Sequence, residues 1–172
     1  MRFLTPASGY AGPIAEDLLR TYLQDHHAGS TAGVELARRA AQANEGTGYG
    51  EGLAEIAREI EEDRDALEEV MERLGVGPHR FKDTAAWTFE KLGRLKPNNR
   101  LLGYSPLSRV VELEGLVLGV TGKLGLWEAL RTAIGDGLEG VDFELLAERA
   151  LDQRTRLEQL RRTAAAEALQ QD

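Results

Sequence analysis

The chain has 172 residues, a formal net charge of −8, three histidines and no cysteine. Its length suits one domain with one core, and its many Leu, Ala, Glu and Arg residues favour helices over strands. The absence of cysteine excludes disulfides, thiolate zinc sites and a cysteine nucleophile. The negative charge disfavours nucleic acid as a partner. No apolar signal segment follows the N-terminal methionine, so we expect a cytoplasmic protein.

The first two expected helices cover residues 13–44 and 51–74. Pro13 suits the first position of a helix. Apolar and small residues then recur at steps of three, four or seven, which is typical of a helix with one buried face, and His26 falls in this stripe. Gly75 suits the end of the second helix. These two segments therefore predict a helical hairpin.

Two further helices are expected over residues 106–134 and 142–165. Ser105 and Asp142 precede them and are residue types that cap helix N-termini. We expect the chain after Arg162 to fray, because terminal residues without burial are poorly ordered.

Residues 78–105 form a long connector, in which a short helix is expected over residues 83–92. The connector is basic and follows an acidic helix, so its charges are expected to face solvent or to pair with that helix. A simple up-and-down bundle needs only short loops, whereas two antiparallel hairpins joined by one long crossover need a connector of this length. The sequence therefore predicts an all-α four-helix bundle with a long crossover between its second and third helices.

A weak internal repeat relates the second expected helix to the fourth. When Leu53 is set on Phe143, apolar residues coincide along both helices and Asp63 falls on Gln153. The other coincidences are Ile56 with Leu146, Ala57 with Ala147, Ile60 with Ala150, Leu67 with Leu157 and Val70 with Leu160. In the other pair of helices, setting Leu36 on Leu124 places His26 on Glu114, so we expect these two side chains to face each other in the core.

This layout resembles the ferritin-like superfamily, and in particular its families of unassigned function. Metal-binding members of that superfamily use a Glu from helices one and three and a Glu-x-x-His from helices two and four. The resemblance assigns the metal-ligand positions to His26, Glu114, Asp63 and Gln153. Both motif Glu positions are apolar here, at Ile60 and Ala150, and neither motif His is present. The resemblance thus implies a degenerate site without stoichiometric iron.

Two interpretations of the acidic residues on these helices remain open. Glu59 with Asp63, and Glu148 with Asp152, are spaced i,i+4 and could form a carboxylate cluster for magnesium, manganese or calcium. Alternatively, these acids lie at the edge of the buried face and pair with arginines, as charged residues at this spacing often do. The arginines available are Arg58, Arg64, Arg149 and Arg156.

The third expected helix contains four glycines on one face, Gly115, Gly119, Gly122 and Gly125. Each costs about 1 kcal/mol of helix propensity relative to alanine. Because close approach of another backbone would offset that cost, we expect this helix to cross the first helix at Gly29-x-x-x-Gly33. Charged residues interrupt the apolar run, so a membrane span is not expected.

The apolar residues of the third helix cover more of its circumference than one core needs. We therefore expect a homodimer formed through this helix. The competing account is that the connector, with Trp87, Phe89 and Leu92, covers the same surface within one chain.

Two classes of function follow from these residues. The first is a non-catalytic, homo-oligomeric bundle that acts as a binding or structural module without a cofactor. The second is an oxidoreductase or hydrolase that uses a divalent metal held by His26, Asp63, Glu114 and Gln153.

Overall fold

The computed structural model describes residues 13–77, 104–135 and 138–170, with side chains from residue 16 onward. The described residues form four α-helices and no strand, which confirms the all-α prediction of a four-helix bundle. None of these helices is long and apolar enough to span a membrane. The expected helix over residues 83–92 lies outside the described residues. The helices are α1 (Pro13–Ala43), α2 (Gly50–Arg73), α4 (Pro106–Ile134) and α5 (Phe143–Leu169).

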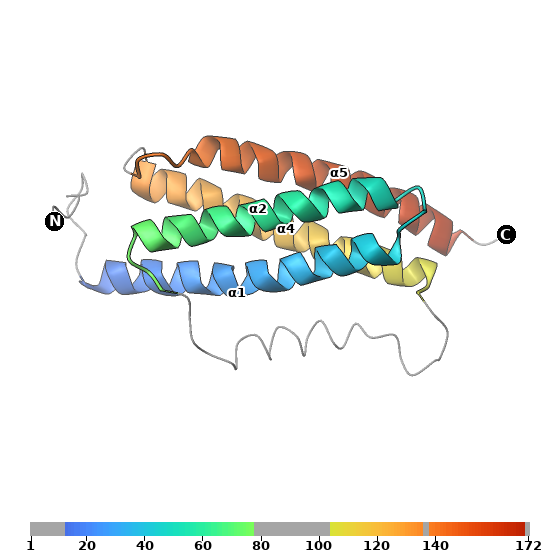
Figure 1. Cartoon of the computed structure of the whole chain (residues 1–172), viewed down its shortest axis with the longest axis horizontal. Helices are drawn as coiled ribbons and strands as arrows, with labels where there is room; N and C mark the ends of the chain where they lie inside the picture. The colour runs from blue at the N-terminus through green and yellow to red at the C-terminus, as the bar shows by residue number, and fades with distance from the viewer. Residues whose placement is uncertain (1–12, 78–103, 136–137, 171–172) are drawn as a thin grey trace.

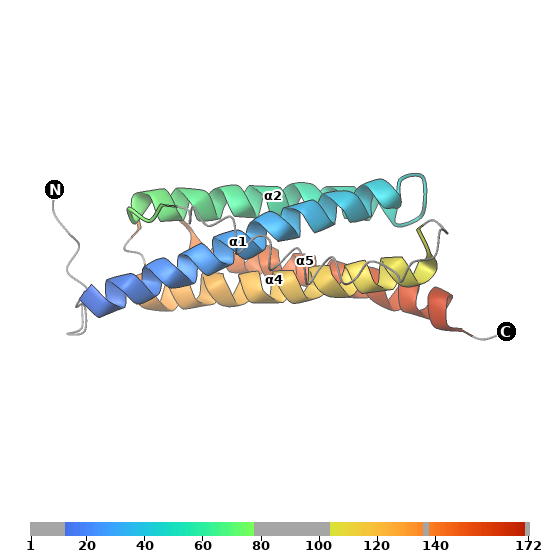
Figure 2. The same cartoon turned by 90° about the horizontal axis from the view of Figure 1, so that it is seen from below.

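The four helices are arranged as two antiparallel hairpins that stack in two layers (Figure 2). One layer contains α1 and α2 and the other contains α4 and α5, while α4 runs in the same direction as α2 (Figure 1). At one end of the bundle, Gln24 Nε2 of α1 donates a hydrogen bond to the Gly77 carbonyl at 2.9 Å. At the other end, Asn44 Nδ2 donates to the Tyr104 hydroxyl at 2.7 Å. Residues 77 and 104, which flank the connector, therefore lie at opposite ends of the bundle.

The helix ends follow local sequence chemistry. The Ser108 amide donates to Ser105 Oγ at 3.1 Å, and the Leu145 amide donates to Asp142 Oδ1 at 2.9 Å. Both expected N-caps are thus confirmed. Gly75, just after α2, has a φ of +69°, a left-handed conformation that glycine adopts without a Cβ penalty.

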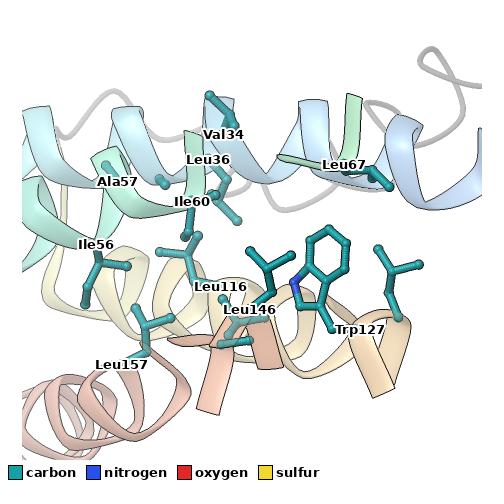
Figure 3. Close-up of a cluster of buried hydrophobic side chains, with 14 of the residues drawn as sticks. Val34, Leu36, Ile56, Ala57, Ile60, Leu67, Leu116, Trp127, Leu146 and Leu157 are labelled. Carbon is teal, nitrogen blue, oxygen red and sulfur yellow. The ribbon is translucent and has the colours of Figure 1, made fainter. Parts of the chain in front are cut away.

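The core confirms the predicted repeat between the second and fourth helices, here α2 and α5. Figure 3 shows Ile56 and Ile60 of α2 facing Leu157 of α5 and Leu116 of α4. Equivalent positions of the two helices are buried together, because both present the same apolar stripe to the shared interior. The matched buried pairs are Leu53 with Phe143, Ile56 with Leu146, Ala57 with Ala147, Ile60 with Ala150 and Leu67 with Leu157.

The prediction that the chain frays after Arg162 is wrong. Helix α5 continues to Leu169, and Ala164 is only 1% exposed. Arg109 Nη1 of α4 lies 3.4 Å from Glu167 Oε2, so the last turns of α5 have tertiary partners that the local sequence does not reveal.

Helices α1 and α4 face each other with their glycines, as expected, but the expected close approach of their backbones there is wrong. A Cβ placed on Gly29, Gly33, Gly119 or Gly122 would meet no described atom within 4 Å. Only at Gly115 is another residue close, where the added Cβ would lie 3.1 Å from Leu36 Cδ2. Apart from Gly115, the glycines of α1 and α4 therefore make no tight contact with any described residue.

This arrangement predicts that alanine at Gly119 or Gly122 stabilises the protein. Each substitution should raise the free energy of unfolding by about 1 kcal/mol, because helix propensity improves and the new methyl group has room. Urea denaturation followed by circular dichroism measures the change. Gly50→Ala is the opposite control, since its Cβ would lie 2.7 Å from the Asn44 carbonyl oxygen and should destabilise. A loss of stability in both α4 variants would contradict the open geometry.

Candidate functional site

The glycines of α1 and α4 border a cavity of about 380 Å³ between α1, α2 and α4. We call it the α1/α4 groove. Its walls include Gly29 and Gly33 of α1 and Gly115, Gly119 and Gly122 of α4. Its apolar lining consists of Leu36, Ile60, Leu67, Leu116, Leu118, Val120, Leu126 and Trp127, and its polar lining of Asp25, His26, Ser30, Asp63, Arg64 and Lys123.

A buried polar cluster closes the inner side of the groove. The Lys123 ammonium of α4 donates hydrogen bonds to Asp63 Oδ2 of α2 and to Gln153 Oε1 of α5. Gln153 Nε2 donates in turn to Asp63 Oδ2 at 3.0 Å, and Arg149 forms an ion pair with Asp63 Oδ1. Asp63 is 2% exposed and Gln153 is 0% exposed. The cluster therefore joins three of the four helices in the core.

The charges in this cluster are paired with one another, although Asp63 Oδ1 has only the ion pair with Arg149 and no hydrogen bond to a described residue. Burial lowers the pKa of Lys123, and the Asp63 carboxylate opposes that shift by favouring the ammonium. Taking a charge out of water is expensive unless it is paired and hydrogen-bonded. Lys123 and Asp63 meet that condition, so the cluster acts as an internal cross-link.

The structure brings together three of the four predicted metal-ligand residues. Asp63 and Gln153 are hydrogen-bonded, as their equivalent places in the repeat suggested, and His26 lines the same groove as Asp63. Glu114 lies elsewhere. Its side chain is 51% exposed, and its Oε1 is 3.6 Å from Arg161 Nη1 of α5.

The prediction that His26 and Glu114 face each other in the core is therefore wrong. Position 114 on α4 points toward α5, whereas the face of α4 toward α1 carries the glycines and Lys123. The register that relates α2 to α5 does not extend to the other two helices, because α1 runs obliquely across the bundle (Figure 2).

Of the four acids at these i,i+4 spacings, Glu59, Asp63 and Asp152 form ion pairs with arginine, as the second interpretation predicted, whereas Glu148 pairs with no described arginine. Arg156 Nε lies 2.7 Å from Asp152 Oδ2, and its guanidinium also pairs with Glu59. Arg149 Nη1 lies 3.4 Å from Glu62 Oε2. Within the described ranges, no three His, Asp or Glu side chains are grouped so that they could hold a metal ion.

His26 contacts Tyr22 through its ring edge, with ring centroids 4.6 Å apart. Burial lowers the pKa of His26, and the nearby Asp25 carboxylate partly opposes the shift. The adjacent His27 points to α2 instead, where its Nε2 lies 2.9 Å from Glu68 Oε1. The two histidine side chains therefore lie in different environments, as expected for neighbours on a helix.

The sequence analysis did not predict two residues of this site, Lys123 and Trp127. Lys123 is the only charged residue between Glu114 and Glu128, so an isolated charge in an apolar helix was the available signal. Trp127 is fully buried and stacks with Phe143, with ring centroids 6.4 Å apart. Its Nε1 hydrogen-bonds no described residue, and no sequence signal reveals that state.

Comparison with known protein families, with curated proteins and with solved structures finds no match to this chain. The site is therefore interpreted from its own geometry.

The buried cluster predicts strong coupling between Asp63 and Lys123. Asp63→Leu alone should lower the free energy of unfolding by about 3–5 kcal/mol, because it leaves the Lys123 ammonium buried without its carboxylate. Lys123→Met in the same chain should restore much of that loss. A double-mutant cycle in urea measures the coupling. Glu68→Ala, at the exposed pair with His27, is the control and should cost less than about 1 kcal/mol. If the changes in the free energy of unfolding of the two core substitutions simply added up in the double variant, the predicted coupling would be contradicted.

The lowered pKa of His26 predicts a specific loss of stability in acid. In the folded state the pKa of His26 lies below its ordinary value of 6.5. As the pH falls through 6.5, the unfolded state therefore binds more protons than the folded state. The free energy of unfolding should decrease from that pH downward, by at most about 1.4 kcal/mol per pH unit for one group. Comparing wild type with His26→Gln between pH 7.5 and pH 5 isolates this contribution, since the variant should lack it. Identical pH profiles would show that His26 does not titrate in this way.

Proposed function

We propose that this protein is a non-catalytic helical bundle that binds an apolar small molecule in the α1/α4 groove. The observation that carries the proposal is a cavity of about 380 Å³ whose walls are glycine and whose lining is mainly apolar. Pockets for small ligands have this character and range from about 300 to 1,000 Å³. Glycines within helices are destabilising, and at Gly29, Gly33, Gly119 and Gly122 no described side chain fills the space that they leave. An occupant of the groove would offset that cost.

The polar cluster supports binding over catalysis. A catalytic lysine or carboxylate needs a group that is free to react or to exchange a proton. Lys123 and Asp63 instead bind each other, and Gln153 and Arg149 hold them in place. A divalent metal at Asp63 would have to displace two cations, so the metal-dependent alternative draws little support from this cluster.

The arrangement of the helices supports a ferritin-like topology as part of this proposal. Helices α2 and α4 are parallel, and the ends of the connector lie at opposite ends of the bundle (Figure 1). A bundle of this kind offers its ligand sites between facing helices, which is where the groove lies.

A homodimer remains the second candidate, with another copy of the chain as the occupant of the groove. The observation in its favour is Leu118, which lines the groove and is 74% exposed. The remaining apolar residues on which the dimer prediction was based are buried or half-buried within one chain. Helix α4 thus exposes far fewer of these apolar side chains than the sequence suggested.

Binding of an uncharged fluorescent probe tests the proposed function. N-phenyl-1-naphthylamine should bind the wild-type protein with one site and gain fluorescence as it enters an apolar environment. Gly119→Leu should weaken this binding at least tenfold, because its side chain projects into the groove. Gly119→Ala is the matched control, with the same helix gain but little added volume, and should retain most of the affinity.

Absence of saturable binding by the wild-type protein would contradict the proposal, as would equal affinities of the two Gly119 variants. Sedimentation of the same samples identifies the second candidate. A wild-type species near twice the chain mass that Leu118→Glu converts to a single chain, together with no probe binding, would favour the homodimer.

A further inference from the structure

Helix α1 is packed unevenly along its length. Among residues 16–30 only the side chain of Leu23 is buried, and in this part Leu18 is 66% exposed and Tyr22 is 36% exposed. Between residues 31 and 43 the buried apolar side chains are those of Ala32, Val34, Leu36, Ala37 and Ala40. Helices in proteins are held in place chiefly by the packing of their apolar face. The first part of α1 is therefore held less firmly than the second.

The polar contacts of α1 divide at the same place. In the first part, Gln24 and His27 bond to α2 and to the segment that follows it, and no hydrogen bond or ion pair joins a described side chain of this part to α4 or α5. In the second part, Arg39 Nε lies 2.9 Å from Glu112 Oε1 of α4. Directly after the helix, the buried Asn44 side chain also accepts a hydrogen bond from α4. Polar contacts therefore tie only the second part of α1 to the opposite layer.

The boundary between the two parts carries residues that weaken a helix. Gly29 costs about 1 kcal/mol of helix propensity relative to alanine. The Ser30 hydroxyl donates to the His27 carbonyl at 2.8 Å, and the Thr31 hydroxyl donates to the same carbonyl at 3.2 Å. Such hydroxyl bonds destabilise a helix slightly and often bend it, and helices also kink at Gly/Ser pairs. Residues 29–31 are therefore the place at which α1 bends most easily.

From these observations we infer that residues 29–31 form a hinge, and that residues 13–28 of α1 swing out as a unit while the rest of the bundle stays folded. We call residues 13–28 the α1 arm. The arm contributes Asp25 and His26 to the wall of the α1/α4 groove, so its departure opens the groove from one side. Proteins open in cooperative units of this kind, and binding sites are often built on the least stable of them. The opening itself is independent of the proposed function, whereas its use as the entrance for the ligand rests on that function.

Native-state hydrogen exchange of the full chain, followed by NMR, tests the hinge. The amides of residues 20–28 should exchange at least about tenfold faster than those of residues 36–43, because a helix as short as the detached arm is marginal in water. Gly29→Ala should slow exchange in the arm about fivefold, since it improves the helix propensity of the hinge and its Cβ meets no described atom within 4 Å. Gly119→Ala on α4 is the matched control. It brings the same gain in propensity outside the hinge and should change exchange in the arm less than about twofold.

The rate of probe binding tests the use of the opening as an entrance. In stopped-flow mixing with N-phenyl-1-naphthylamine, Thr31→Ala should slow association and dissociation alike, by about threefold, because it removes a hydroxyl bond that weakens the hinge and improves helix propensity. The affinity should stay unchanged, since Thr31 lies outside the lining of the groove. Thr132→Ala is the matched control. Its hydroxyl donates to the Glu128 carbonyl within α4, so its loss should change neither rate.

Two outcomes of the exchange experiment would overturn the hinge. The first is equal slowing of the arm by Gly29→Ala and Gly119→Ala, which would show that the arm opens only when the whole chain unfolds. The second is exchange in the arm as slow as in residues 36–43. Wild-type binding rates in Thr31→Ala would overturn the entrance. Failure of the probe to bind at all would overturn the proposed function but not the exchange result, so the two failures are distinguishable.

Discussion

The buried ion pair between Asp63 and Lys123 is the interaction on which the arrangement of the bundle depends. Its charges come from α2 and α4, and Gln153 and Arg149 add contacts from α5. A charge in the core is tolerated only when its partner is present with good geometry, so the pair allows one register of the two layers. Apolar contacts alone would permit sliding, because leucine and alanine side chains of similar volume can exchange neighbours at little cost. The polar cluster therefore specifies the alignment that the apolar stripe stabilises.

Helix α1 takes no part in this cluster, and that difference explains the groove. Its ion pairs and hydrogen bonds to other helices lie on other faces or at its ends. His27 pairs with Glu68, Arg39 pairs with Glu112, and Asn44 accepts a hydrogen bond from Arg109. Along its middle, α1 presents Gly29 and Gly33 to a face of α4 that also carries glycines. Two glycine faces have few side-chain atoms to interdigitate, so the space between them stays open. The cavity thus arises where three helices are cross-linked and the fourth is held at other points.

The predictions that held were those determined by local chemistry and periodicity. The caps at Ser105 and Asp142 depend on a side-chain oxygen beside free amides, and a sequence displays both. The shared stripe of α2 and α5 depends on spacing within each helix, and it correctly placed Asp63 beside Gln153. The predictions that failed concerned how one helix faces another. The glycines of α1 and α4 have the spacing of a close crossing, yet spacing within two helices does not specify the distance or angle between them.

The sequence by itself determined that this chain is an all-α bundle, where its described helices begin, and which stripes of α2 and α5 are buried. These properties depend on residues a few positions apart. Only the tertiary structure decided that Glu114 points toward Arg161 instead of His26, that Lys123 enters the core, and that Trp127 is fully buried with its Nε1 hydrogen-bonded to no described residue. Those outcomes depend on the rotation of each helix about its own axis and on the oblique path of α1. Both depend on all the contacts between helices together, so they cannot be read from any single segment of the sequence.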